Sequence, residues 1–170
     1  MGGGNVPYFN HLNMDQYSQF LYYFSNAIWG RGGNEDICSK LVLLNRELSG
    51  CWISYKGKLP DIFILMHPVG SVIGHRNVAF SDYLVIMQNI TINGTTSELK
   101  LGQALFIGAG VKIIGGGVIG DRVSIGANTL VRNPHIQDDY IVYQDTGTGI
   151  VTQKVNQKDY CFAEKYFYIK

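Results

Sequence analysis

Aliphatic residues recur at every sixth position through the second half of the chain, at Leu101, Ile107, Ile113, Ile119, Ile125 and Val131. The same six-residue spacing of apolar residues occurs earlier, at Phe80, Ile86 and Ile92. Six residues form one short strand and a corner, and three such units close a triangular coil whose aliphatic side chains stack inward. The pattern therefore predicts a mainly β chain with a parallel β-helix over residues 53–145. A β-sandwich would instead show alternation, with turns every 8–12 residues.

Two features of the repeat refine this prediction. Glycine, which tolerates backbone angles that a side chain penalises, directly follows four of the six aliphatic residues, at Gly102, Gly108, Gly120 and Gly126. The step from Ile92 to Leu101 is nine residues instead of six. We therefore expect a loop within residues 93–100 to project from the coil.

The first fifty residues have a helical period instead. One helix is expected to begin near Asp15 and to end at Gly30, with apolar residues at helical intervals. A second is expected after Asn34, a good N-terminal cap, and to end at Ser49-Gly50. The predicted organisation is a small helical segment (1–52), the β-helix (53–145) and a tail (146–170), with the two helices expected to pack between subunits.

Composition excludes several classes of partner. The formal net charge is +1 and 16% of residues are charged, so no basic stripe is available for nucleic acid or for a membrane surface. No segment reads as a membrane span. The cysteines Cys38, Cys51 and Cys161 have no metal-ligand spacing, which indicates no metal site and a reducing, cytoplasmic setting.

Three segments resemble motifs of one family, in the same order. Met66–Gly74 resembles His-x-x-Gly-x-x-Ile-Gly, Gln88–Gly94 resembles Gln-x-x-Thr-x-Gly-Gly, and Ile107–Gly115 resembles Ile-Gly-Ala-Gly-Ala-Lys-Ile-x-Gly. These are motifs of the serine acetyltransferase branch of the hexapeptide-repeat acyltransferases, and the likeness spans about residues 15 to 135. The resemblance implies a left-handed β-helix, a homotrimer with a site between neighbouring β-helices, and acetyl-CoA as co-substrate without a permanently bound cofactor. It implies O-acetyl transfer to serine or another small hydroxyl compound.

His67 is the candidate catalytic base. Acetyl transfer to a hydroxyl removes the hydroxyl proton as the new bond forms, and an imidazole can accept that proton at neutral pH. Pro68 disfavours the helical region for the residue before it, so we expect His67 to be extended at the end of a strand. The alternative is a histidine that merely ends a strand.

Small and polar residues near the later motifs are the other candidates. Gly108, Ala109 and Gly110 would let the pantetheine arm of CoA approach the backbone, and Lys112 would meet a CoA phosphate. Gln88 is expected to orient the acceptor, as is Glu98, which stands where the family has a second histidine. Each small residue, and Gln88, is otherwise explained as an ordinary corner.

Departures from the family leave the acceptor open. Met66 and Trp52 stand where the family has carboxylates, and the loss of a partner for an ammonium group argues against free serine. Asp61, Asp82 or a neighbouring subunit would have to supply the partner of His67. The alternatives are O- or N-acetylation of a sugar in surface-polysaccharide synthesis, or a non-catalytic scaffold. The aromatic residues of the tail, Tyr160, Phe162, Tyr166, Phe167 and Tyr168, are expected to pack in a core or an interface.

Overall fold

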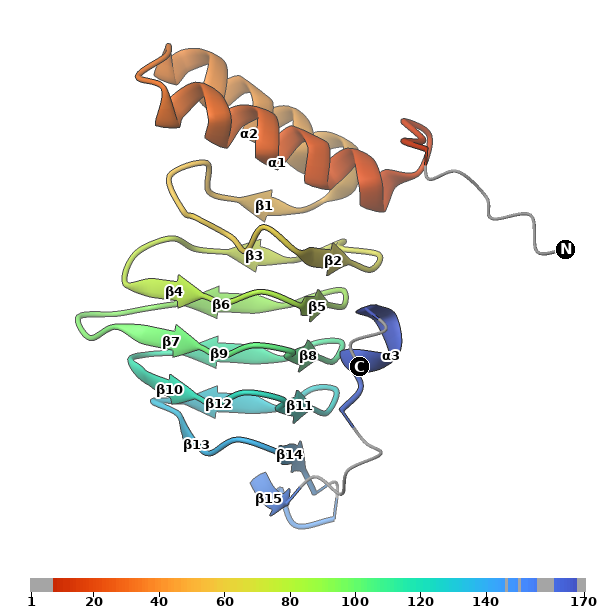
Figure 1. The fold of residues 1–170 in the computed structure, drawn as a ribbon, viewed down its shortest axis with the longest axis vertical. Coiled ribbons are helices and arrows are strands. Elements are labelled where there is room, and N and C mark those ends of the chain that lie inside the picture. The colour runs from red at the N-terminus through yellow and green to blue at the C-terminus, as the bar shows by residue number, and fades with distance from the viewer. Residues whose placement is uncertain (1–7, 146, 150, 156–160, 168–170) are drawn as a thin grey trace, which may run out of the picture.

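The computed structural model describes residues 8–145, 147–149, 151–155 and 161–167. Two antiparallel helices lie across one end of a β-solenoid (Figure 1), and they are α1 (Met14–Gly30) and α2 (Glu35–Ser49). The side chains of Asn13 and Asn34 cap their first turns, and Gly50 ends α2 in the left-handed conformation. Both expected helices are present. Among the described residues, no helix is long and apolar enough to cross a membrane.

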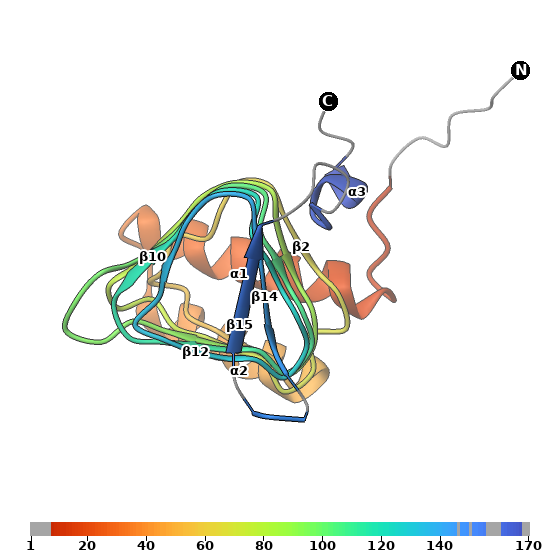
Figure 2. The ribbon, with the colours of Figure 1, turned by 90° about the horizontal axis from the view of Figure 1, so that it is seen from below.

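Three parallel sheets form the walls of the solenoid, and Figure 2 shows its triangular cross-section. Sheet A contains β1 (Trp52–Ile53), β3 (Val72–Ile73), β6 (Thr91–Asn93), β9 (Lys112–Ile114) and β12 (Leu130–Arg132). Sheet B contains β2 (Phe63–Leu65), β5 (Leu84–Ile86), β8 (Phe106–Ile107), β11 (Ser124–Ile125) and β14 (Tyr140–Gln144), with β15 (Val151–Val155) added antiparallel. Sheet C contains β4 (Val78–Phe80), β7 (Leu99–Leu101), β10 (Gly117–Ile119) and β13 (His135–Ile136). The chain visits the sheets in the order B, A, C in every full coil.

The six-residue register of the sequence is the register of the coils. In sheet B, Ile107 pairs with Ile86 and with Ile125, and Ile92 pairs with Ile113 in sheet A. These residues are at most 1% exposed and belong to one core that runs along the axis. The expected parallel β-helix is therefore confirmed, and the nine-residue step forms a loop between β6 and β7 that extends beyond the other coils (Figure 2).

The helices are fixed to the first coil by a few specific contacts. Tyr22 of α1 enters the solenoid core, where its hydroxyl donates to the Gly57 carbonyl at 2.9 Å and accepts the Leu59 N–H at 2.8 Å. Between the helices, the buried side chain of Asn45 bonds the hydroxyl of Ser18 at 2.8 Å. The first turn of α1 is therefore held at a defined place above the solenoid.

The described part of the tail covers the outer face of sheet B. The short helix α3 (Glu164–Phe167) lies beside this sheet (Figures 1 and 2). Phe162 and Tyr166 contact the ring of Phe106, and Phe167 contacts Tyr83. Tyr160 and Tyr168 lie outside the described residues. The aromatic side chains described here thus pack on the chain's own β-helix.

The inward stacking predicts that two neighbouring isoleucines of β9 contribute very differently to the free energy of unfolding. Ile113 is fully buried, whereas Ile114 is only partly buried. We expect Ile113→Ala to lower the free energy of unfolding by about 2–5 kcal/mol, and Ile114→Ala to lower it by less than half as much. Urea denaturation followed by circular dichroism measures both, and equal losses would contradict the assigned register.

Candidate functional site

The edge where sheet B turns into sheet A is a stack of similar corners, here called the B–A edge (residues 66–71, 87–90, 108–111 and 126–129). Backbone hydrogen bonds join each corner to the next. The N–H of Asn89 donates to Val69 at 2.8 Å, and the N–H of Gly110 donates to Gln88 at 2.9 Å. Three of the sequence motifs therefore meet on one edge of the molecule.

The first corner of this edge is two residues longer than the corners that follow it. Eight residues separate the paired core positions Leu65 and Ile73, whereas six separate Ile86 from Ile92. Val69 takes the position that stacks on Gln88, because its carbonyl accepts the hydrogen bond from the next corner. The surplus pair, His67 and Pro68, therefore bulges away from the coil, and the side chain of His67 is 74% exposed.

The backbone of His67 differs from the expectation. Its φ is +51°, in the left-handed region, so the prediction that Pro68 holds it extended is wrong. The carbonyl of His67 accepts the N–H of Val69 at 2.7 Å, which closes a tight turn around Pro68. The turn closes within the two surplus residues, and this constraint outweighs the preference imposed by the proline.

A carboxylate that sequence reasoning assigned only to a helix start lies beside His67. Oδ1 of Asp15 accepts the backbone N–H of His67 at 3.0 Å, and Oδ2 of Asp15 lies 3.7 Å from Nδ1 of the imidazole. Asp82, one of the expected partners, instead accepts the backbone N–H groups of Asp61 and Ile62. Asp15 is 52 residues from His67 in sequence, so no local motif could have paired them.

Gln88 lies on the corner next to His67 and is incompletely satisfied. Its Oε1 atom is buried and has no hydrogen-bond partner among the described residues. A buried acceptor without a donor costs about 1–3 kcal/mol, and this one lies on the same edge as the other candidate residues.

The predicted donor-binding residues follow on the third corner of the same edge. A Cβ at Gly108 would lie 2.7 Å from the carbonyl of Ile125, so the next coil requires a glycine there. Gly110 has a φ of +74°, which also favours glycine. Lys112, at the start of β9, is exposed. Corner packing alone thus explains the two glycines.

Glu98 lies at a different edge of this chain. It is in the loop before β7, where sheet A turns into sheet C, and it pairs with Lys100 at 3.3 Å. The loop lines a polar cavity of about 710 Å³ together with Arg132 and His135. Within one chain, the structure therefore brings His67, Gln88 and Gly108–Gly110 to one edge and Glu98 to another.

No cluster of three or more His, Cys, Asp or Glu side chains that could hold a metal ion is present in the described part of the chain. The thiols of Cys38, Cys51 and Cys161 are all free and buried. Burial raises the pKa of the Cys51 thiol to about 12. These groups are therefore unsuited to act as nucleophiles.

The unpartnered oxygen of Gln88 gives a stability prediction. We expect Gln88→Met to leave the free energy of unfolding unchanged or to raise it by up to about 1 kcal/mol, because no hydrogen bond of Oε1 is lost. The matched variant is Asn45→Leu, which removes the buried bonds of Asn45 to Ser18 and Ser49, and it should cost about 1–3 kcal/mol. Equal losses in urea denaturation would show that Gln88 is satisfied in solution.

Comparison with known proteins gives a consistent picture. No protein-family model matches the chain. The serine acetyltransferase of Haemophilus influenzae is 33% identical over 154 residues, which cover 86% of this chain and 55% of that protein. The serine acetyltransferase of Helicobacter pylori is 32% identical over 100 residues, which cover 56% of this chain and 58% of that protein. The chain thus spans about half the length of the curated relatives it matches.

Solved structures show the same fold. A serine acetyltransferase in complex with cysteine has a TM-score of 0.74 at 21% identity, covering 89% of this chain and 58% of that chain. The enzyme from Brucella abortus has a TM-score of 0.73 at 20% identity, covering 85% and 57%. At these identities the structural likeness shows the fold alone. In sequence the chain is a homologue of serine acetyltransferases, and its β-solenoid is consistent with the hexapeptide-repeat acyltransferase fold that its three motifs predicted.

Proposed function

We propose that the chain is an acetyl-CoA-dependent O-acetyltransferase of the serine acetyltransferase type, with His67 as its general base. The observation that supports this most directly is the B–A edge itself. An exposed imidazole at the first corner shares that edge with the glycine-containing corner Gly108–Gly110, two coils away. Sequence similarity alone would not distinguish an active enzyme from an inactive relative. The B–A edge adds a candidate base, His67, and a candidate surface for the acyl donor.

The proposed chemistry is a direct transfer. One imidazole nitrogen of His67 takes the acceptor's hydroxyl proton as the oxygen attacks the thioester carbonyl carbon. The C–S bond then breaks, and the imidazolium returns the proton to the leaving CoA thiolate, so that no charge is left on the protein. General base catalysis of this kind contributes on the order of 10²–10⁴ in rate. Backbone N–H groups along the edge are the available donors for the transient oxyanion.

The B–A edge also has features suited to acetyl-CoA, the acyl donor. An extended pantetheine arm needs a surface without large side chains, and the partly exposed Ala109 and Gly110 have none, whereas Gly108 is buried against the next coil. Lys112 is exposed at the adjoining strand, where its ammonium is available to a phosphate group. The corner that carries Gln88 lies between these residues and His67, and the unpartnered Oε1 of Gln88 could accept a hydrogen bond from a substrate once the side chain turns out of its buried position.

The site of one chain is open on one side, so we infer that neighbouring chains complete it in a homotrimer. His67 is 74% exposed and Glu98 lies on another edge, where it would face a neighbouring chain. Both helices also expose large apolar side chains: Phe20, Phe24, Ile37, Leu43, Leu44 and Leu48. Such patches are typical of interaction surfaces. The free thiols fit a reducing compartment, and we place the protein in the cytoplasm on that ground.

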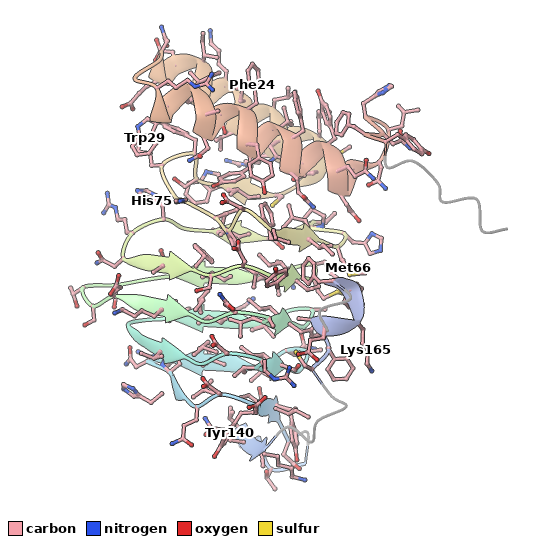
Figure 3. All side chains as sticks on the ribbon, viewed as in Figure 1. Phe24, Trp29, Met66, His75, Tyr140 and Lys165 are labelled. Carbon is pink, nitrogen blue, oxygen red and sulfur yellow. The ribbon has the colours of Figure 1, made fainter. Side chains whose placement is uncertain are left out.

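The acceptor is proposed to be a hydroxyl without a neighbouring ammonium group, such as a sugar. Met66 (Figure 3), which replaces a family carboxylate beside His67, packs against the apolar cluster that contains the tail residues Cys161 and Ala163. This position therefore gives an amino acid's ammonium no ionic partner. Free serine is the alternative acceptor, because the homologues are named for it.

The test is release of CoA from acetyl-CoA by the purified full chain, with a panel of serine, homoserine and several sugars. Acceptor-dependent release is expected, and His67→Asn should reduce it by on the order of 10²-fold or more. Asparagine tolerates the left-handed backbone of residue 67, so this variant should fold, which circular dichroism checks. Unchanged release by His67→Asn would exclude the mechanism. No release with any acceptor would favour a non-catalytic scaffold.

The oligomer is tested separately. Light scattering coupled to size exclusion should give three times the 18.9 kDa of one chain, or a multiple of that trimer if the helices join two trimers. A monomer at micromolar concentration would contradict a site completed by neighbours.

A further inference from the structure

The imidazole of His67 is exposed, so packing within the β-helix does not orient it. We propose that Asp15 of α1 is the positioning residue of His67: its carboxylate accepts the proton on Nδ1 and so leaves Nε2 as the base. This assignment rests on the proposed function. Asp15 supplies a partner of His67 that the repeat does not, since Met66 and Trp52 stand at the positions where the family has carboxylates.

Both carboxylate oxygens of Asp15 lie close to His67. Oδ1 accepts the backbone N–H of His67 at 3.0 Å, which fixes the left-handed residue at the bulge. Oδ2 lies 3.7 Å from Nδ1, within the range of an ion pair and about 0.5 Å beyond a hydrogen bond. Rotation of the exposed ring closes that gap, and catalytic hydrogen bonds in unliganded enzymes are often long.

The face of α1 explains why Asp15 points at the solenoid. Asp15, Ser18 and Tyr22 are spaced at i, i+3 and i+7, so they lie on one face of the helix. Ser18 and Tyr22 are buried, with Tyr22 anchored by its two hydrogen bonds to the first coil. Tyr22 also makes an edge-on contact with Phe63, whose strand leads directly to His67. The contact between Tyr22 of α1 and Phe63 of β2 therefore fixes the helix against the strand, and this arrangement places Asp15 beside His67.

The cap of α1 holds the turn that carries Asp15. Oδ1 of Asn13 accepts the N–H groups of Asp15 at 3.0 Å and of Gln16 at 3.2 Å. A carboxylate at this place is also favoured by the positive end of the helix dipole. When His67 takes a proton, Asp15 faces the imidazolium at short range and stabilises its charge, as the orienting carboxylate does in other His-dependent enzymes.

The test compares Asp15→Asn with a matched variant on the second helix. Asp36 occupies the same helical position, the second residue after an asparagine cap that accepts its N–H at 2.7 Å. Asp36→Asn thus removes the same charge from the same kind of helix end, away from His67. Both substitutions keep an oxygen that can accept a backbone N–H. The full chain is used throughout.

Two readouts are needed. Nitrogen-15 NMR of the imidazole ring at about pH 8.5, where a histidine is neutral, reports which nitrogen holds the proton. We expect the Nδ1–H form to predominate in the parent and in Asp36→Asn, and the Nε2–H form to gain in Asp15→Asn. Steady-state kinetics should show kcat lowered by about tenfold or more in Asp15→Asn with KM within about twofold, and neither changed in Asp36→Asn.

The outcomes separate this inference from the proposed function. A tautomer that is the same in Asp15→Asn and the parent would overturn the positioning role, even if the enzyme is active. An equal fall in kcat for Asp36→Asn would also overturn it, because a general effect on helix stability would then suffice. A tautomer change in a chain that releases no CoA would uphold the pairing and refute the proposed function.

Discussion

The inward stacking of one aliphatic side chain every six residues determines the rest of this structure. Ile86 and Ile107 stack although they are 21 residues apart, and Ile107 and Ile125 stack at 18 residues, because the three additional residues project as a loop between β6 and β7. The core positions therefore stay in register from coil to coil, and the corners stack with them. The regular edges of the solenoid therefore follow from core packing alone. Gly108 and Gly110 are required by this packing, whether or not they also contact a ligand.

The candidate site lies where that regularity is broken. At the first B–A corner, two surplus residues move His67 out of the stack, while the next corner of this edge keeps the six-residue repeat. The exposed imidazole of His67 and the small residues Gly108–Gly110 thus lie on the same edge. The first results from an interruption of the repeat, and the second from its continuation. A second interruption, the loop that contains Glu98, lies on another edge and would meet this one only between chains.

The sequence predicted the parts of the molecule that follow from short-range periodicity. The six-residue register, the loop before Leu101 and the two capped helices could all be inferred, because each depends on residues within one or two turns. The backbone of His67 could not, since closing a two-residue bulge overrides the preference imposed by Pro68. Asp15 could not be paired with His67, because their meeting depends on how α1 docks on the first coil. The division of the chain at residues 52 and 145 stays a prediction.

The central claim is that the B–A edge binds the acyl donor, and a crystal structure of the full chain with CoA tests it most directly. The account predicts density for the pantetheine arm along Gly108–Gly110, with its sulfur end toward His67. Density in the polar cavity near Glu98 and Arg132, with none along the B–A edge of any chain, would contradict it.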